Sequence, residues 1–256
     1  MIKNTKFLAT LSSVIAQTIF GFSFMFSKIA LDHVSPFELI ATRYAIAFIG
    51  LTLVVLFTRE KLRFGKNFFL LLLMSFFQPV LYFVFETYGI LMTTSSFSSV
   101  MISLIPVVSM LCGIVVLKEY PSFWQYVFTA VSVAGVFIMA NHGTSDGTVT
   151  MLGFVLLLGA VLSAVGYNVL SRKISSDYTS FERTYAMAII GFVSFMSMAL
   201  INDVKCLSRM AKAFTNAHFT SSVLYLGIVS LGTFVFCLFS KKLMRMLLNN
   251  ENHKTL

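Results

Sequence analysis

Long apolar segments alternate with short charged ones along almost the whole chain. A helix that crosses the hydrocarbon core of a bilayer needs about 20 mostly apolar residues, and about eight segments of this sequence reach or approach that length. They lie at 8–30, 37–58, 67–88, 95–117, 123–140, 150–171, 184–202 and 219–240. We therefore predict an all-α integral membrane fold with about eight transmembrane helices.

The first apolar segment, 8–30, is longer than the hydrophobic core of a cleavable signal peptide, and no small-residue cleavage site ends it. We expect it to be a retained helix. Another segment, 203–218, is apolar at helical spacing with cations between the apolar positions. That pattern fits a short interfacial helix, and an ordinary solvated loop fits it equally well.

Composition agrees with a membrane protein. Charged residues make up 11% of the chain, against roughly 25% in soluble domains, which leaves too few polar side chains to cover a water-facing surface. The net charge of +9 does not indicate nucleic-acid binding, because the cations form short clusters between apolar runs. With a cytoplasmic N-terminus, most loop cations fall inside, and Lys205, Arg209 and Lys212 fall outside. Both termini are therefore expected in the cytoplasm, at the cell membrane.

The residue types that hold metals or nucleotides are not arranged for that purpose. Cys112, Cys206 and Cys237 have no CxxC spacing, and the four histidines are scattered. The glycine-rich signature of a phosphate-binding loop is not present. We expect no metal, no cofactor and no disulfide framework.

A short motif recurs at an offset of 144 residues. Ser35-Pro36-Phe37-Glu38 returns as Thr179-Ser180-Phe181-Glu182, and Ser27-Lys28 falls on Ser171-Arg172. Five predicted helices separate the two copies, and an odd number places them in opposite orientations across the bilayer. Inverted repeats of this kind are a recurrent plan of secondary transporters.

Several short motifs in residues 10–140 occur in the order and spacing of a known family. The chain resembles the EamA-type branch of the drug/metabolite transporter superfamily. The resemblance rests on Phe20-Gly21-Phe22-Ser23-Phe24 with Lys28, Pro36 with Arg43 and Ala45, Tyr88-Gly89-Ile90, Thr93-Thr94-Ser95-Ser96, Ile105-Pro106-Val107, Leu117-Lys118-Glu119, and Gln125 with Gly135-Val136. It implies ten helices in two inverted halves of five, cytoplasmic termini and a central cavity between the halves.

The resemblance also implies a division of the chain. Residues 8–140 correspond to a first repeat with helices one to five, and 150–240 to a partial second repeat with helices six to eight. Residues 241–256 form a basic and polar tail. Counterparts of helices four and five are expected after residue 240, where the chain instead turns basic, so we expect a family member shortened at its C-terminus.

Polar residues inside the third predicted helix form one candidate site. Ser75, Gln78, Tyr82, Glu86 and Gly89 recur at three or four residues, which places them on one face of a continuous helix. A charged side chain within a membrane span costs free energy, so we expect Glu86 to have a functional or a structural role. Glu86 either contacts a cation or carries a proton in a cavity wall, or it forms a structural pair with Lys28 or Arg43.

Two further cations lie in the first two predicted helices. Lys28 ends a stripe that includes Gln17, and its ammonium is expected to meet an anionic substrate group, to pair with Glu86 or to extend to the headgroups. Arg43 lies one turn into the second helix and is expected to have a structural or snorkelling role.

Small and hydroxyl residues follow one face of the fourth predicted helix, a pattern typical of a cavity wall. Ser95, Ser99, Ile102, Pro106, Ser109 and Gly113 recur at three or four residues. Pro106 removes a backbone hydrogen bond at mid-membrane depth. Small hydroxyl residues either bind a substrate or permit close helix packing. Glu119, at the end of this segment, is interpreted as a structural or gating contact.

We predict a permease that moves small metabolites or drugs by secondary transport, with a cavity lined by helices one, three, four, six and eight. Its partners are the lipid bilayer and a small-molecule substrate but no nucleic acid, and oligomer formation is left open. One alternative is a non-transporting remnant or a subunit completed by a partner. A membrane-embedded enzyme is a minor alternative, because the acids are isolated rather than paired.

Overall fold

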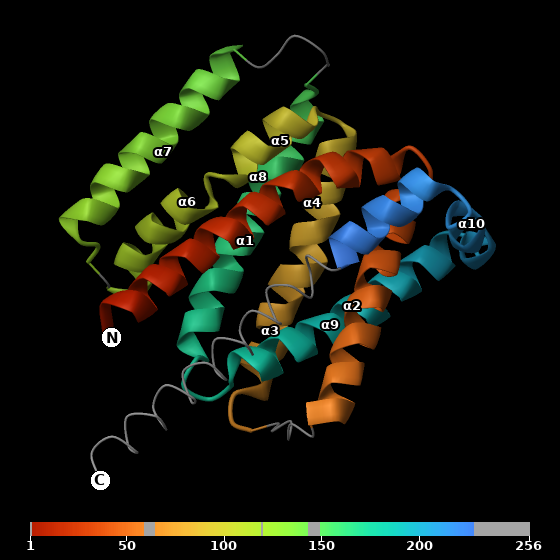
Figure 1. The fold of residues 1–256 in the computed structure, drawn as a ribbon, viewed down its shortest axis with the longest axis horizontal. Helices are drawn as coiled ribbons and strands as arrows, with labels where there is room; N and C mark the ends of the chain where they lie inside the picture. The colour runs from red at the N-terminus through yellow and green to blue at the C-terminus, as the bar shows by residue number, and fades with distance from the viewer. Residues whose placement is uncertain (1, 59–64, 119, 143–148, 228–256) are drawn as a thin grey trace.

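The computed structural model describes residues 2–58, 65–118, 120–142 and 149–227, and in these ranges it contains helices but no strands. The elements are α1 (Ile2–Leu31), α2 (Pro36–Thr58), α3 (Phe68–Ser75), the π-helical turn η1 (Phe76–Leu81), α4 (Tyr82–Leu91), α5 (Ser95–Ile102), α6 (Ile105–Cys112), the π-helical turn η2 (Gly113–Leu117), α7 (Phe123–His142), α8 (Met151–Lys173), α9 (Ser180–Asn202) and α10 (Cys206–Ala213). Figure 1 shows their arrangement.

Five helical spans are long and apolar enough to cross a membrane: Pro36–Phe57, Phe68–Leu91, Ser95–Val116, Met151–Lys173 and Ser180–Asn202. They confirm the second, third, fourth, sixth and seventh predicted helices. The first and fifth predicted helices correspond to α1 and α7. The eighth prediction, 219–240, is helical as far as residue 227, and its remainder lies outside the described residues.

Two of the five spans are interrupted. In the third predicted helix, Gln78 has an extended backbone (φ −141°, ψ 113°) and is followed by a cis peptide bond to Pro79. The expected single face from Ser75 to Gly89 is therefore wrong, because the extended residue separates Ser75 from the part that begins at Tyr82. In the fourth predicted helix, α5 ends at Ile102 and α6 begins at Ile105, with Pro106 in its first turn.

Helices α2 and α9 pack against each other and run in opposite directions. Phe48 of α2 stacks on Phe192 of α9, with ring centroids 5.3 Å apart and an interplanar angle of 8°. Towards the start of α2, Tyr44 packs against Phe195, and towards its end the hydroxyl of Thr52 lies 3.3 Å from that of Tyr185. The paired residue numbers rise on one helix and fall on the other, which defines the antiparallel crossing.

The recurrent sequence motif marks the start of both helices. The carboxylate of Glu38 accepts the backbone N–H of Ser35 at 2.8 Å, and that of Glu182 accepts the backbone N–H of Thr179 at the same distance. In α9 the Thr179 hydroxyl also accepts the N–H of Glu182, which completes a capping box. Both carboxylates are buried, so the Phe-Glu motif has a local structural reason in each copy.

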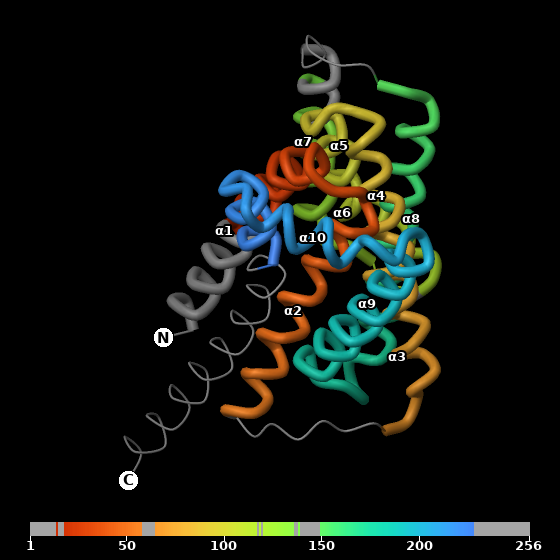
Figure 2. The backbone as a smooth tube through the Cα atoms, turned by 90° about the vertical axis from the view of Figure 1, so that its right-hand side faces the viewer, coloured from red at the N-terminus to blue at the C-terminus, as the bar shows by residue number. Residues whose placement is uncertain are grey.

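Segment 206–213 forms the short helix α10, which confirms the helix alternative over the loop alternative. Cys206 and Met210 point into the protein and Leu207 remains exposed. Arg209 forms an ion pair with Glu38 at the start of α2 (2.6 Å) and another with Asp203. The hydrogen bond from Arg209, followed by that from the Lys205 N–H, holds the pKa of the Asp203 carboxyl below its usual range. These contacts attach α10 to the first half of the chain, beside α2 (Figure 2).

Helix α8 is held against α3, η1 and α4, and this contact fixes one wall of the site described below. Gly159 of α8 lies against the ring of Phe85, and Gly166 lies against that of Phe77. Small residues let helix backbones approach closely in membrane bundles. Helix α7 lies at the edge of the bundle, beside α5 and α6 (Figure 1).

Candidate functional site

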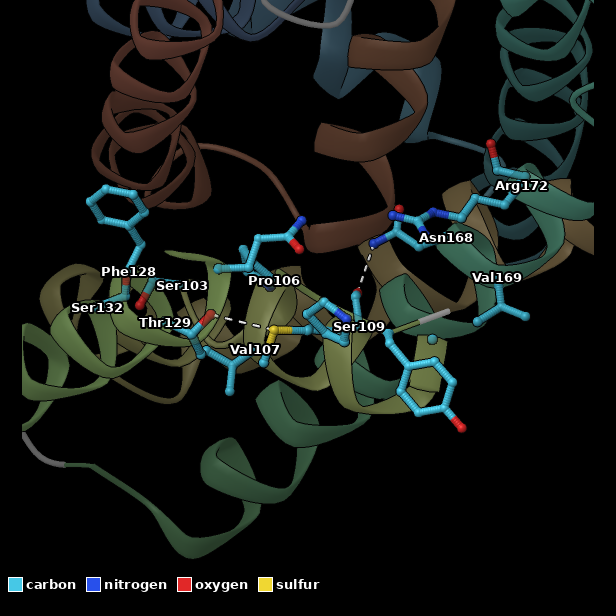
Figure 3. Close-up of a pocket in the computed structure, with 16 residues that line it drawn as sticks. Ser103, Pro106, Val107, Ser109, Phe128, Thr129, Ser132, Asn168, Val169 and Arg172 are labelled. Carbon is cyan, nitrogen blue, oxygen red and sulfur yellow. Dashed lines mark hydrogen bonds between the residues drawn. The ribbon is translucent and has the colours of Figure 1, made fainter. Parts of the chain in front are cut away.

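A cavity of about 930 Å³ lies between α5–α6, α7 and α8. Figure 3 shows its lining, with Phe128 at one end and Arg172 at the other. Cavities that hold small molecules commonly measure about 300–1,000 Å³. The space is therefore large enough for a metabolite-sized ligand.

The interrupted helix α5–α6 forms one wall. Ser103, Pro106, Ser109 and Gly113 line the cavity from this side. The hydroxyl of Ser103 donates to the carbonyl of Val100 (2.6 Å) just before the break between α5 and α6. Pro106 has no N–H to donate and lies in the first turn of α6, where that donor is not needed. With the hydroxyls of Ser103 and Ser109, this wall carries polar groups although its span is apolar.

Helix α7 and the segment before it form the second wall. The lining residues at 125, 128, 129 and 132 are spaced by three, one and three residues, so they share one helical face. The Thr129 hydroxyl donates to the sulfur of Met110 across the cavity wall (3.7 Å). Phe128 presents its ring to the cavity (Figure 3), and the Gln125 side chain accepts the N–H of Ser122 (2.7 Å).

Helix α8 forms the third wall with Asn168, Ser171 and Arg172. The Asn168 amide donates to the Ser109 hydroxyl (3.0 Å) and so joins α8 to α6 (Figure 3). Arg183 of α9 donates to the carbonyl (2.7 Å) and to the hydroxyl (2.6 Å) of Ser171. Two guanidinium groups thus lie at or beside this end of the cavity, and no carboxylate is found among the described lining residues.

A separate group of charged and phenolic side chains is buried between α2 and α4. Tyr82 donates to the Glu86 carboxylate at 2.7 Å, and Glu86 is only 3% exposed. The Arg43 guanidinium lies 4.5 Å from the centre of the Phe83 ring, and its charge interacts with that of Glu86. Neither Arg43 nor Glu86 lines the cavity. The Arg43 side chain thus joins α2 to α4 through the Phe83 ring and places a positive charge near the Glu86 carboxylate.

Lys28 has a different partner from any that the sequence suggested. Its ammonium donates to the carbonyls of Ile90 (2.7 Å), Leu91 (3.2 Å) and Thr93 (2.9 Å). The last carbonyls of a helix have no partner within the helix and carry partial negative charge. Lys28 therefore caps the C-terminal end of α4, and the expectation that it pairs with Glu86 is not met.

Comparison with known proteins places this all-helical chain in a family. The sequence model of the EamA-like transporter family matches residues 7–141, which is more than half of the chain. The chain belongs to the EamA-like transporter family. The resemblance inferred from the short motifs is thereby confirmed, and the chain is a multi-pass membrane protein.

Individual relatives agree with the family. The uncharacterized transporter YcxC of Bacillus subtilis is 33% identical over 90% of this chain and 75% of its own length. A second B. subtilis protein, the uncharacterized transporter YetK, is 25% identical over 75% of this chain and 60% of its own length. An uncharacterized transporter of Archaeoglobus fulgidus is 22% identical over 83% and 72%.

The other residues predicted for the site of this EamA-like chain are distributed as follows. Pro106 lines the cavity, whereas Ser99 donates to the carbonyl of Ser96 (2.8 Å) and Gln78 is half-buried at the helix break, both outside the cavity lining. The side chain of Gln17 and the whole of Glu119 lie outside the described residues.

Sequence reasoning missed most of the polar lining of the EamA-like cavity. Helix α7 was not expected to contribute, although Gln125, Thr129 and Ser132 are spaced by four and three residues. Asn168 and Arg172 are four residues apart on α8, which is the spacing of one helix face. Polar residues that recur at helical spacing within an apolar span were the available signal.

Proposed function

We infer that this EamA-like chain is a permease that moves a small organic molecule across the cell membrane by secondary transport. The observation that carries the inference is the cavity of about 930 Å³ between three helical walls. Polar side chains within membrane spans are costly and usually face a pathway or a partner. Here Asn168, Ser109, Thr129 and Ser132 face one space large enough for a metabolite.

The arrangement of α2 and α9 supports an inverted repeat of 8–140 and a partial 150–240, followed by a tail at 241–256. Phe48 and Phe192 are counterparts at the 144-residue offset, and they stack on each other. In a two-fold arrangement, a residue contacts its own counterpart only at the axis. The N-terminal ends of the two helices carry equivalent carboxylate caps. Alternating exposure of a site between two such halves is how inverted-repeat transporters operate.

Transport in this proposal is driven by a gradient, with the N-terminus in the cytoplasm. Glu86 is the proposed proton carrier, since it is buried in the membrane and hydrogen-bonded by a phenol. The buried carboxylates of Glu38 and Glu182 each accept a backbone N–H at a helix start, which favours a structural role for them. The nearby charge of Arg43 gives Glu86 a structural alternative that the experiment must separate from proton transfer.

Purified protein is reconstituted in vesicles that contain a pH-sensitive dye and is tested with a broad panel of amino acids, organic acids, amines and nucleosides. We expect saturable, substrate-dependent flux for a subset of the panel. A tryptophan at Ser132, in the cavity lining, should abolish flux. The matched change at Ser197, an exposed serine of α9, should leave flux intact.

The absence of flux with every compound would contradict the proposal. So would equal transport by the Ser132→Trp and Ser197→Trp variants, because it would exclude the cavity as the route. For the proton, the Glu86→Gln variant should lose coupling while it retains binding. Unchanged pH dependence in that variant would remove Glu86 from the coupling step.

A further inference from the structure

We propose that α10 and the turn before it form a membrane-interface surface that binds anionic phospholipid. Its apolar flank enters the boundary between the headgroups and the acyl chains, and Lys205 and Lys212 contact the lipid phosphate groups. The inference rests on the surface of α10 alone and is independent of the cavity and of transport.

Contacts on two sides fix the rotation of α10 about its own axis. Cys206 and Met210 lie one turn apart and are 0% and 7% exposed. Arg209 forms an ion pair with Glu38 at the start of α2 (2.6 Å) and a second one with Asp203. The other faces of α10 are therefore turned away from the protein, and their side chains are available to the surroundings.

One exposed flank of α10 is apolar. Leu207, Ala211 and Phe214 are spaced by four and three residues, so they share a helix face, and Leu207 is 53% exposed. Just before α10, Val204 is 80% exposed, and Ile201 in the last turn of α9 is 86% exposed. Because α9 is long and apolar enough to span the membrane, the exposed side chain of Ile201 faces lipid. The apolar flank of α10 thus follows directly on a lipid-facing surface.

The other exposed flank of α10 is cationic. Lys205 and Lys212 are exposed and lie about two helical turns apart, on one face. The acids of this surface are engaged elsewhere, since Glu38 and Asp203 both bind Arg209. The Lys205 ammonium acts on Asp203 through its charge, but neither lysine side chain forms an ion pair with any residue that the structure describes. Two ammonium groups are thus available to phosphate oxygens.

The two flanks together favour a bilayer as the partner. An apolar face beside a basic face is typical of helices that lie in the plane of the membrane interface, and α10 begins within four residues of the end of a membrane span. It lies at the edge of the bundle, next to that end of α9 (Figure 1). Lysines near an anionic membrane surface gain free energy from the surface potential, so the preferred lipid is an anionic one.

Quenching of a tryptophan on the apolar flank by brominated lipids tests the proposal. Trp124→Phe removes the single tryptophan of the chain, and Leu207→Trp places a fluorophore on α10. The full-length variant is reconstituted in vesicles of phosphatidylglycerol and phosphatidylcholine in equal amounts, with bromine on the acyl chains of one lipid or of the other. The surface charge is then the same in both sets. Because one lysine near an anionic surface is worth about fivefold in affinity, we expect a local excess of phosphatidylglycerol of at least about threefold.

Lysine variants locate the effect. Lys205→Gln combined with Lys212→Gln should abolish the excess of phosphatidylglycerol and leave the total quenching unchanged, because the apolar flank is intact. Lys205→Arg combined with Lys212→Arg should retain the excess. The matched control combines Lys66→Gln with Lys173→Gln, which removes two exposed lysines at the opposite ends of the spans and should leave the excess unaltered. Should the glutamine variant fail to fold, a rise in salt concentration on the reporter variant tests the same contact, since screening should reduce the excess.

Three results would overturn the proposal. Lack of quenching by either lipid would show that α10 does not contact the bilayer, and protection of the same tryptophan from aqueous acrylamide would then mean that protein covers it. Equal quenching by the two lipids would remove the preference for the anionic headgroup. An excess that survives the two glutamine substitutions, or high salt, would exclude the lysines as its cause. None of these outcomes depends on flux, so the permease and the lipid-binding surface stand or fall separately.

Discussion

Gly191 lies where α9 crosses α2, and replacement by alanine would insert a methyl group into a filled space. A Cβ at this position would lie 2.4 Å and 2.6 Å from two ring carbons of Tyr44 and 2.8 Å from Cγ of Pro79. The Tyr44 ring is packed between Phe83 and Phe195, with centroid distances of 5.4 Å to each. Neither the ring nor the proline can move aside without displacing a neighbour.

Two opposing effects determine how much Gly191→Ala changes the free energy of unfolding. Overpacking a well-filled core costs about 1–3 kcal/mol, and two rigid neighbours place this site at the upper end. Alanine is favoured over glycine in a helix by about 1 kcal/mol. The Gly191→Ala variant should therefore be less stable than the unchanged protein by about 2 kcal/mol.

The assay is reversible unfolding in mixed detergent micelles, followed by circular dichroism. Gly135 of α7 is the matched control, because no atom lies within 4 Å of the Cβ that alanine would add there. Gly135→Ala should raise stability by up to about 1 kcal/mol. Two variants that change stability with the same sign would refute the reasoning, since only contact at the crossing separates the two positions.

Three other substitutions test charged side chains, the first two by the same unfolding assay and the third by amide hydrogen exchange. Glu86→Gln keeps an acceptor for Tyr82 but removes the charge opposite Arg43, and should cost about 3 kcal/mol; no loss would show that the two charges do not stabilise each other. Lys28→Met removes the cap from α4 and should cost about 1–2 kcal/mol, whereas unchanged stability would mean that water replaces the ammonium. Arg209→Ala should speed amide hydrogen exchange in α10, because it removes the ion pair with Glu38, and unchanged exchange would contradict that anchoring role.

The membrane spans were predictable because bilayer thickness fixes their length. The prediction 37–58 corresponds to α2 at Pro36–Thr58. The seventh helix begins at Ser180 rather than 184, since the charged pair Glu182–Arg183 was counted as loop. In the structure, Glu182 belongs to the capping box that starts the helix, and Arg183 donates to Ser171 of α8. A charge near a span end is therefore compatible with helix when it has a local partner.

The contacts of Lys28 were not predictable from the sequence. Its partners are backbone carbonyls, which every residue carries, so no side-chain pattern marks them. The break at Gln78 had a local signal in Pro79. The packing of Pro79 against Gly191 of α9 was not predictable in the same way. It is a contact between segments more than 100 residues apart, and periodicity within one helix gives no information about such a contact.

Several charged side chains that the sequence offered as site candidates have structural partners and do not line the cavity. Arg43 and Glu86 interact with each other, Lys28 caps a helix, and Glu38 holds both a helix start and Arg209. The polar groups that line the cavity are instead mainly neutral, and neutral groups cost less to place in a membrane than charges do. Loss of transport in Glu86→Gln consequently has two meanings. If it accompanies a loss of stability, it reports a damaged scaffold, and only a loss of coupling at full stability would assign the proton to this carboxylate.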